Sequence, residues 1–495
     1  MSNGTFVRRD ASKMDDWDPV LYWYARAVGR LQQRPLTDPT SWVFQGCIHG
    51  VPPTVTEQNE AFNQCPHGGW FFLPWHRGYL WYFERIIRAA IKEIAAEENI
   101  TPDPSTTWAL PYWNYALDAP TKARPTTFTS RALPAAFRSP KMPDRPGGTN
   151  LTVDNPLFVR DDLDPPREDF WNTQYRGLGV NDAKQVLPYS DINPFTAMSE
   201  TIFAATKSRG QTIQPTFGSE ITYTDMIHFQ RAFGDLEDVP HNQVHGGVGG
   251  WMTRVEGSAR DPIFWLHHAN IDRLWSGWLA KDNLNPDHTS WLDHEFIFFD
   301  ETGQQKRPST ETVLKDAQNY SYESLTDGAG TRRAMVPPAP APQAGQRVLA
   351  ASVVGNPRQL LDVQAPTTVT LEPSGVAGAM RSLAASDEPQ TNLILTVHNV
   401  HSDLPPGTPF HVFLNGPSGD LDPEGPYFVG WISFFGMAGA GGHDASYDVT
   451  EQVQRLTEQG LLPDGPLTVS IVPSVPKPET RAPKPSFENV SLTSI

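Results

Sequence analysis

The sequence predicts a mainly α domain, a four-helix bundle with long loops, followed by a smaller antiparallel β-sandwich domain. Helical runs alternate with Pro- and Asn-rich loops up to about residue 325, and short β-rich runs follow. Between them, residues 336–345 read Val-Pro-Pro-Ala-Pro-Ala-Pro-Gln-Ala-Gly, the composition of a stiff, extended linker. We therefore place the first domain at 1–330, a linker at 331–346, the β-sandwich at 347–475 and a Pro-rich tail at 476–495.

Four segments of the first domain have the pattern of helices. The first is 22–31, and the second begins at Pro74 and continues to about residue 97, with apolar residues at three- and four-residue steps. The third begins after Pro240, and the fourth follows Asp261, a suitable N-cap. Four helices with inward-facing ligands are a common way to build a metal site in a bundle. We expect the loop-rich region 119–215 to wrap around the outside of this bundle.

The part beyond the linker is predicted to be a small antiparallel β-sandwich. Its candidate strands are short and are separated by clusters of Gly, Pro and Asp. They are residues 347–354, 369–371, 392–397, 410–414, 427–434 and 467–472.

Composition excludes several classes of partner. The chain has 495 residues, a formal net charge of −17 and two cysteines. Its acidity argues against nucleic acid or an anionic membrane surface as a partner, because both are polyanions. Two cysteines are too few for a disulfide scaffold. No segment resembles a signal peptide or reaches the roughly eighteen apolar residues of a membrane-spanning helix, so we expect a cytoplasmic protein; secretion with a helper protein stays open.

Six histidines fall into two groups of three, and this pattern decides the functional interpretation. Neutral imidazole is the commonest protein ligand of copper, zinc and iron. Since no carboxylate or thiolate is obviously among them, the six indicate two metal ions, each held by three imidazoles. The groups are His49, His67 and His76, and then His241, His245 and one of His267 and His268.

The local spacing fits this interpretation. His241 and His245 lie four residues apart and therefore share one helical face. In zinc hydrolases with this spacing a glutamate follows the first histidine as general base, but here Asn242 follows, which cannot accept a proton. His67 is expected on a loop and His76 in the first turn of the helix after it. The sequence therefore disfavours a hydrolase.

Only one histidine of the adjacent pair His267 and His268 can face the metal, because neighbouring helical residues diverge. Asp272 lies one turn after His268. It is suited either to holding a metal-binding imidazole in place or to pairing with Arg273.

Two segments resemble the copper-binding signatures of tyrosinases. One runs from His67 to Leu-Pro-Trp-His76-Arg, and the other is Asp261-Pro-Ile-Phe-Trp-Leu-His-His268-Ala-Asn-Ile-Asp272-Arg-Leu-Trp. This family of type 3 copper proteins includes catechol oxidases and molluscan-type haemocyanins. The resemblance covers roughly residues 5–325, and the β-rich part is similar, through weaker motifs, to the shielding domain of longer members. The supporting motifs are Val7-Arg8, Leu110-Pro-Tyr-Trp-Asn-Tyr115 and Tyr320-Ser-Tyr322.

The resemblance implies a dinuclear copper centre that uses dioxygen to oxidise small phenolic substrates. It leaves open whether a helper protein delivers the copper. Carried over by position, copper A would be held by His49, His67 and His76, and copper B by His241, His245 and His268, with His267 as the non-ligand of its pair.

Further residues acquire expected roles from the same resemblance. The family's counterpart of Phe264 sits over the copper pair and packs on a ligand imidazole. Cys65 stands two residues before His67, the spacing at which fungal relatives form a thioether between the sulfur and the imidazole ring. Cys47 has the same spacing to His49, which is unusual. A disulfide between the two cysteines, or two plain buried thiols, are the alternatives.

Glu237, four residues before His241, and Asn242, directly after it, match family positions that orient a water. Such a water can take the proton of a phenol, whose free pKa is near 10. This favours hydroxylation of monophenols in addition to oxidation of catechols, whereas a plain helix-entry carboxylate is the other interpretation of Glu237. Ser258 and Gly246 are small, which would leave the entrance and the copper B side open.

Three activities remain compatible with the sequence: a tyrosinase, a catechol oxidase or o-aminophenol oxidase without efficient phenol hydroxylation, and an oxygen carrier. A zinc-bound structural protein is a fourth, more distant alternative. The aromatic run 427–435 also has two interpretations, a lid over the active site or an ordinary buried strand. The sequence does not give the oligomeric state.

Overall fold

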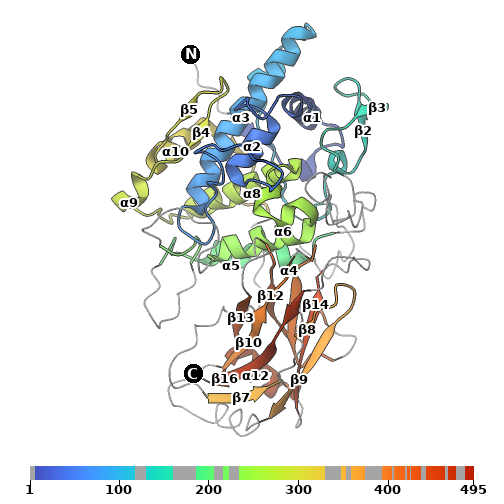
Figure 1. Ribbon diagram of the computed structural model, residues 1–495, viewed down its shortest axis with the longest axis vertical. Helices are drawn as coiled ribbons and strands as arrows, with labels where there is room; N and C mark the ends of the chain where they lie inside the picture. Colours follow the sequence, from blue (N-terminus) through green and yellow to red (C-terminus); the bar gives the residue numbers. More distant parts are fainter. Residues whose placement is uncertain are drawn as a thin grey trace. The chain divides into compact units, whose positions relative to one another are not determined.

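The computed structural model describes fourteen ranges of the chain, which fall into two compact units (Figure 1). The described residues up to 328 form the N-terminal unit, and those from 347 form the C-terminal unit. The predicted division into a helical domain and an antiparallel β domain is confirmed. The described ranges are 6–117, 130–159, 186–205, 216–221, 233–328, 347–352, 358–373, 393–403, 406–417, 421–423, 425–435, 442–462, 466–474 and 485–494.

The core of the N-terminal unit is built around the long helix α3 (Phe72–Glu97), which packs against α1 (Pro19–Gln32) and α8 (Pro262–Leu279) (Figure 1). The carboxylate of Asp18 caps α1, and that of Asp261 caps α8 by accepting the N–H of Ile263. In both helices proline follows the cap, where its missing N–H costs nothing. The predicted start of α8 is therefore confirmed.

One helix of this core is not among the predicted four. Helix α2 (Trp42–His49) is only eight residues long and ends on His49, whereas α1, which was predicted, carries none of the six histidines. Ser41 caps α2 by accepting the N–H of Phe44. The C-cap Gly50 allows the backbone of α7 (Val255–Ser258) to come close, because a Cβ there would lie 2.6 Å from the Val255 oxygen.

The segment after Pro240 is also less regular than predicted. A kinked turn, Glu237–Asn242, with non-helical backbone at Val239, leads into α6 (Gln243–Val248). Three parts of the region 119–215, namely 119–129, 160–185 and 206–215, lie outside the described residues. The other short elements of this unit are the 3-10 turns Ala11–Lys13, Pro104–Thr106, Ala135–Phe137, Gly250–Thr253 and Ala317–Asn319, the helices α4 (Tyr189–Ile192), α5 (Phe195–Ser199), α9 (Thr289–Leu292) and α10 (Thr310–Asp316), and the strands β1 (Phe6–Arg8), β2 (Lys141–Pro143), β3 (Leu151–Asp154), β4 (Phe298–Phe299), β5 (Gln305–Lys306) and β6 (Tyr320–Tyr322).

Asp272 lies at the centre of a buried charge cluster that joins both ends of this unit to α3 and α8. Its carboxylate accepts from Arg77 Nε (2.5 Å), Arg8 Nη1 (3.2 Å) and the hydroxyls of Tyr320 (2.6 Å) and Tyr322 (2.5 Å). Burial raises its pKa, but the two guanidinium groups and the hydroxyls outweigh this and lower it. The parallel pair β1–β6 brings Arg8 beside the tyrosines.

This arrangement corrects the role expected for Asp272. Its described contacts include neither a histidine of the two groups nor Arg273. Arg273 instead donates to the side chains of Asn270 (2.8 Å) and Asn114 (3.3 Å). Asp272 is therefore an anchor between chain segments.

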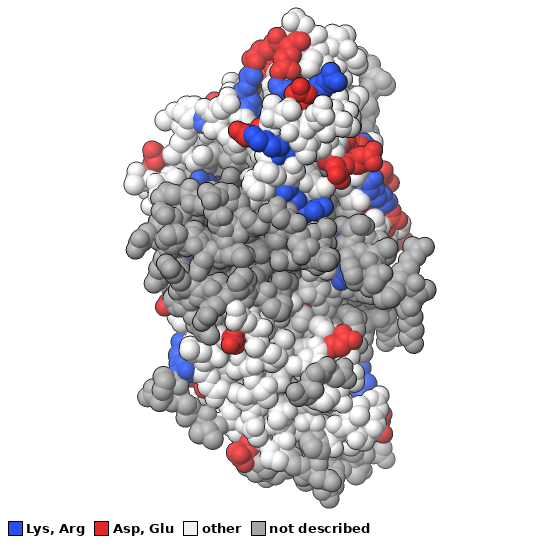
Figure 2. Space-filling view, turned by 90° about the vertical axis from the view of Figure 1, so that its right-hand side faces the viewer, with Lys and Arg blue, Asp and Glu red and all other residues white. Residues whose placement is uncertain are grey.

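At the surface, ion pairs join the acidic end of α3 to basic residues on and just after α1. Arg26, Arg30 and Arg34 of this region form ion pairs with Glu98, Glu97 and Glu93. Figure 2 shows acidic and basic side chains next to one another around this end of the unit. Among the described residues, no helix has both the length and the apolar character needed to cross a membrane.

The C-terminal unit is one antiparallel sheet of eight strands in the order β12-β11-β14-β9-β7-β16-β10-β13. The short pairing of β7 with β9 joins two four-stranded halves. Apolar side chains of both halves form one core, for example Leu395 and Leu492 of one half with Val412 and Ile471 of the other. The strands are β7 (Arg347–Ala351), β9 (Thr367–Pro373), β10 (Leu393–Val400), β11 (Phe410–Leu414), β12 (Phe428–Ile432), β13 (His443–Asp448), β14 (Leu467–Pro473) and β16 (Asn489–Ser494), with the small pair β8 (Gln359–Leu360) and β15 (Ser486–Phe487) and the helix α12 (Thr450–Glu458).

The end of the chain is an integral part of this sheet, so the predicted tail at 476–495 is wrong for its last residues. Strand β16 lies in the middle of the sheet and pairs with both β7 and β10. Val490 and Leu492 point into the core, and Ser491 lies between them on the other face. The sequence of β16 alternates apolar and polar residues, but the Pro-rich residues before it led to the prediction of a tail.

The aromatic run 427–435 behaves as a strand of the sheet. It contains β12, which pairs with β11, and Val429 and Ile432 lie in the core of the unit. Phe428 packs edge-on against Phe413 at 5.6 Å. The interpretation as a buried strand is confirmed, whereas a restraining effect of this unit on activity stays a prediction that cleavage within 336–345 would test.

Replacing Asp272 by Asn should destabilise the N-terminal unit by about 3–5 kcal/mol, since Arg77 and Arg8 lose the carboxylate that neutralises them in a buried site. Thermal or denaturant unfolding of the purified protein would measure this. Lys315→Ala, which removes a solvent-exposed pair with Glu311, is the control and should leave the midpoint nearly unchanged. Equal midpoints for both variants would contradict an anchoring role for Asp272.

Candidate metal centre

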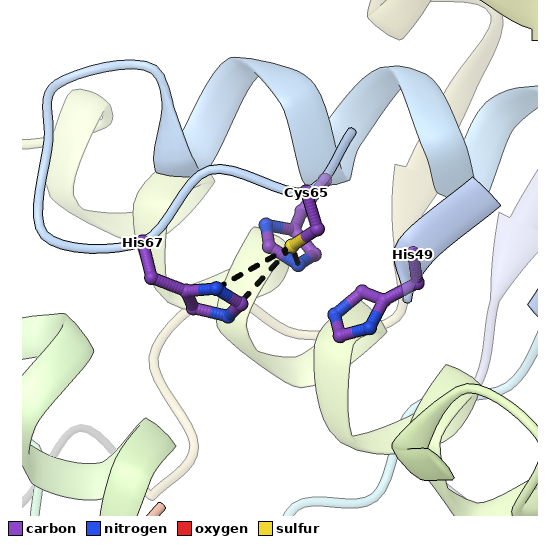
Figure 3. Close-up of side chains that lie close together, drawn as sticks. His49, Cys65 and His67 are labelled. Atoms are coloured by element: carbon purple, nitrogen blue, oxygen red, sulfur yellow. Dashed lines mark hydrogen bonds between the residues drawn. The ribbon is translucent and has the colours of Figure 1, made fainter. Parts of the chain in front are cut away.

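Three histidines from separate segments converge in the core of the N-terminal unit. His49 ends α2, His67 lies on the loop before α3, and His76 lies near the start of α3. Their ring centroids form a nearly equilateral triangle with sides of 5.7, 5.7 and 5.8 Å. Figure 3 shows the rings of His49 and His67 directed toward the same space, next to the sulfur of Cys65. These are the three residues predicted for one metal ion.

A second group forms opposite the first. The rings of His241 and His245 lie 4.6 Å apart, and His268 of α8 lies 4.9 and 5.4 Å from them. The Nε2 atoms of His245 and His268 are 3.2 Å apart. Two nitrogen ligands at about 2.0–2.1 Å from one ion in tetrahedral geometry would lie about 3.3 Å apart, so this spacing fits a shared metal.

Hydrogen bonds at Nδ1 determine which ring nitrogen can bind a metal. Nδ1 of His49 lies 2.8 Å from the Val255 oxygen, that of His76 lies 2.8 Å from the Phe72 oxygen, and that of His245 lies 2.6 Å from the Met252 oxygen. A carbonyl oxygen can only accept, so each Nδ1 carries the proton. The lone pair is therefore on Nε2, which is the usual arrangement at metal-binding histidines.

Four of the six imidazoles are held in their neutral form by burial. Burial lowers the pKa of His76, His245 and His268 well below that of a free imidazole, and the neighbouring histidines lower it further. Burial likewise lowers the pKa of His241 to about 3. Neutral imidazole is the form that binds metals, so no proton has to be removed at pH 7.

The two groups face each other across a short distance. The rings of His76 and His268 stack at 4.3 Å with an angle of 13° between their planes, and those of His67 and His241 lie 5.8 Å apart. The ring of Phe264 contacts one histidine of each group, with its centroid 4.1 Å from that of His268 and 4.8 Å from that of His49. This position agrees with the packing expected for Phe264 on a metal-binding imidazole.

Both members of the adjacent pair lie close to the second group. The ring of His267 is 5.4 Å from His241 and 5.0 Å from His245, and it also lies 5.7 Å from Tyr115. Only His268 stacks on the first group and on Phe264, and this supports His268 over His267 as the third member.

Glu237 connects the two halves of the centre. Its Oε1 accepts the N–H of Gly68, directly after His67, at 2.9 Å, and its Oε2 accepts the hydroxyl of Ser219. Burial raises the pKa of Glu237 to about 8, although both hydrogen bonds act in the opposite direction. The sequence pointed to Glu237 but gave no signal for Ser219.

Asn242 contacts a histidine of the second group directly. Its Oδ1 lies 2.9 Å from Nδ1 of His241. It therefore does for His241 what backbone carbonyls do for His49, His76 and His245, whereas the water-orienting role expected from the sequence stays a prediction.

The two small residues expected near the entrance are both buried. Ser258 is 0% exposed, and its hydroxyl lies 3.5 Å from Nδ1 of His49, behind the first group. It therefore does not line an open entrance. It lies instead on the side of His49 that faces away from the metal position. Gly246 is a buried residue of α6, directly after His245.

Both cysteines are free thiols, so a disulfide between them is excluded in this structure. The Cys65 sulfur lies 3.7 Å from both ring nitrogens of His67 and 3.3 Å from Nε2 of His76 (Figure 3). Burial raises the pKa of Cys65 well above its ordinary value and that of Cys47 to about 11. Both cysteines are therefore protonated thiols at neutral pH.

Comparison with known proteins agrees with this geometry. Residues 39–281 match the common central domain of tyrosinase, and residues 350–492 match a domain of unknown function (DUF7868). The tyrosinase HcTyr1 of Hahella sp. is 31% identical over 493 residues, covering 92% of this chain and 93% of that protein. The chain belongs to the tyrosinase family. Members of this family oxidise phenols at two copper ions, and the two buried histidine groups are suited to hold them.

More distant relatives share the fold. Polyphenol oxidase A1 of Vicia faba is 27% identical over 339 residues, which is 64% of this chain and 47% of that protein, so the chain spans about half of its length. The structure of a latent aurone synthase (polyphenol oxidase) superposes with a TM-score of 0.53 at 18% identity, covering 100% of this chain and 91% of that one. A latent apple tyrosinase gives a TM-score of 0.53 at 18% identity, with 99% and 97% covered.

Loading the metal-free tyrosinase-family protein with copper should raise its unfolding temperature, because the converged imidazoles bind copper only in the folded state. Differential scanning calorimetry with and without Cu²⁺ would show the shift, and a chelator should reverse it. Mg²⁺ is the control, since it prefers oxygen ligands. Equal shifts for the two ions, or none with copper, would contradict a preformed copper site.

Proposed function

We propose that this protein is a tyrosinase in the strict sense: it hydroxylates monophenols at the ortho carbon and oxidises the resulting catechols to o-quinones. The observation that supports the first step is the carboxylate of Glu237. It is hydrogen-bonded to Gly68, beside His67, and it stands four residues before His241. The bacterial relative HcTyr1 is named a tyrosinase, which is consistent with this proposal.

We assign the ligands by the two groups described above. All six rings are buried, and the hydrogen bonds at Nδ1 of His49, His76 and His245 put the lone pair of these three on Nε2, where it can bind a metal. Copper A is assigned to His49, His67 and His76, and copper B to His241, His245 and His268.

The bound copper ions would supply the binding and reduction of dioxygen. The task of the chain's own residues is to move a proton, because a phenol with a pKa near 10 is mostly protonated at neutral pH. Hydrogen bonds from Gly68 and Ser219 fix the Glu237 carboxylate, which still has lone pairs for a water. Burial raises the pKa of Glu237 to about 8, so its carboxylate, once ionised, is a stronger base than an exposed one and can take a proton through that water.

Asn242 and Phe264 complete this arrangement. The Asn242 side chain holds His241 through its oxygen, and its amide nitrogen is a donor able to orient the same water. The Phe264 ring packs on His268 and His49, and it keeps water away from that side of both rings.

Glu237→Gln should lower kcat for tyrosine about 100-fold or more relative to kcat for its catechol analogue, because only the monophenol must lose its proton before hydroxylation. Oxygen consumption by the copper-loaded protein with both substrates would measure this. Asp238→Asn, which changes the adjacent half-buried carboxylate, is the matched control.

Other outcomes select between the alternatives. Equal losses on both substrates would mean that Glu237 only supports the fold of the centre. A wild-type protein that oxidises the catechol but not tyrosine would be a catechol oxidase, and binding of dioxygen without turnover of either would indicate an oxygen carrier.

We also propose a thioether between Cys65 and His67. The sulfur lies equally far, 3.7 Å, from the two ring nitrogens of His67, so the carbon between them is within its reach. The bond would replace one S–H and one ring C–H, and the two electrons and two protons removed would reduce dioxygen, the family's co-substrate, to hydrogen peroxide. A linked His67 ring would be fixed relative to its loop.

Copper-loaded, aerated protein should then be lighter by two hydrogen atoms than the metal-free protein, and only Cys47 should react with a thiol reagent after denaturation. Intact-mass and peptide mass spectrometry would locate the link. Cys65→Ser should abolish the mass change and Cys47→Ser should preserve it. Two alkylated cysteines in the active wild-type protein would rule out the thioether.

A further inference from the structure

We infer that Ser219 is a positioning residue for monophenol hydroxylation: it holds the Glu237 carboxylate in the orientation needed to bind the proton-accepting water. This inference rests on the proposed function of Glu237. It concerns a residue outside both signature segments and outside the two histidine groups, on the short described stretch 216–221.

The direction of the hydrogen bonds at Ser219 is fixed by its partners. Its Oγ accepts the backbone N–H of Gly234 at 2.9 Å, and a backbone N–H can only donate. The single hydroxyl proton is therefore available for Oε2 of Glu237, the other partner of this oxygen. Since the Gly68 N–H holds Oε1 at 2.9 Å, both carboxylate oxygens are fixed, and the plane of the carboxylate is fixed with them.

A rigid backbone frame holds the serine in place. Residues 216–221 form a strap that hydrogen-bonds to 202–205 on one side and to 234–236 on the other. The backbone carbonyl of Glu220 in this strap accepts the N–H of Trp70 at 2.9 Å. Trp70 belongs to the same loop as His67. The strap thus ties together the loop of the first histidine group and the chain that enters Glu237. Its other bonds are Phe217 N to Ile202 O (2.8 Å), Gly218 N to Phe203 O (2.7 Å), Ile221 N to Ala205 O (3.1 Å), Asp235 N to Thr216 O (2.8 Å) and Leu236 N to Phe217 O (3.1 Å).

Close packing at Gly234 brings the two chains near enough for this contact. A Cβ at Gly234 would lie 1.8 Å from the Gly218 oxygen, so no other residue fits there without movement of the backbone. The approach places the Gly234 N–H on the Ser219 hydroxyl. The backbone N–H of Gly234 therefore helps to hold the Ser219 hydroxyl in place.

Burial makes this hydrogen bond important. The side chains of Ser219 and Glu237 are each 1% exposed, so no bulk water replaces a lost partner. Hydrogen bonds to a charged group in such a site are among the stronger ones in proteins. Without the hydroxyl, the carboxylate would keep one fixed oxygen and could rotate about it.

A purely structural role for Ser219 makes a different prediction. If the serine only joined the strap to Gly234, its loss would lower stability and reduce both activities of the enzyme together. A positioning role instead predicts a selective effect on the step that needs the proton transfer, through kcat and not through KM.

Ser219→Ala in the copper-loaded, full-length protein should lower kcat for tyrosine about 10- to 100-fold more than kcat for the catechol analogue, as expected for loss of one hydrogen bond to a charged group. The KM for tyrosine should change little. Ser219→Thr, which keeps the hydroxyl, should restore most of the activity. Ser190→Ala removes another buried serine that donates to a carboxylate, Asp191 at 2.7 Å, and is the matched control, expected to behave as wild type.

A crystal structure of the copper-loaded Ser219→Ala protein provides a readout that does not depend on activity. We expect the Glu237 carboxylate to rotate away from its wild-type orientation. An unchanged carboxylate, or equal losses of kcat on both substrates, would overturn the positioning role. If the wild-type protein lacked monophenol hydroxylation, the proposed function would fail, while the orientation of Glu237 in the two structures would still decide the role of Ser219.

Discussion

The metal centre depends on hydrogen bonds between imidazole Nδ1 atoms and fixed oxygen acceptors. Three of these acceptors are backbone carbonyls, of Phe72, Val255 and Met252. A carbonyl offers no proton, so each bond sets both the tautomer of the ring and the direction of its Nε2 lone pair. The short elements between α6 and α8 are therefore part of the site, although they contribute none of the six histidines. Their close approach to α2 requires Gly50.

A second constraint sets the distance between the two helices that carry the facing rings. On α3, Arg77 directly follows His76, and on α8, Asp272 lies one turn after His268. The ion pair Arg77–Asp272 therefore joins the helices next to the stacked rings of His76 and His268, which lie 4.3 Å apart. Buried ion pairs add little net stability compared with apolar packing, but they select one geometry when their partners are satisfied. Here the geometry selected is the spacing of the two groups.

The sequence predicted what depends on local pattern and missed what depends on distant partners. The strong periodicity of α3 and the Asp-Pro start of α8 were sufficient for both helices. Helix α2 was missed because eight residues, including a glycine, give too short a pattern, and its stability comes from packing. Asp272 was assigned local partners because Arg8 lies 264 residues away in the chain. Six histidines could be grouped by spacing, but no spacing rule could place Ser219 or the carbonyl acceptors, since those contacts exist only after folding.

The placement of Glu237 depends both on its local sequence position and on contacts with distant segments. One of its oxygens is held by the loop of His67, the other by the strap 216–221, and its backbone leads through one kinked turn to His241. Any movement of one histidine group relative to the other would therefore change the geometry of this carboxylate. Oxidation of a catechol needs only the two metals at their proper distance, whereas hydroxylation of a phenol also needs the carboxylate in place. It follows that hydroxylation of phenols should be more sensitive than oxidation of catechols to changes in the strap, the His67 loop or the kinked turn Glu237–Asn242 that joins them.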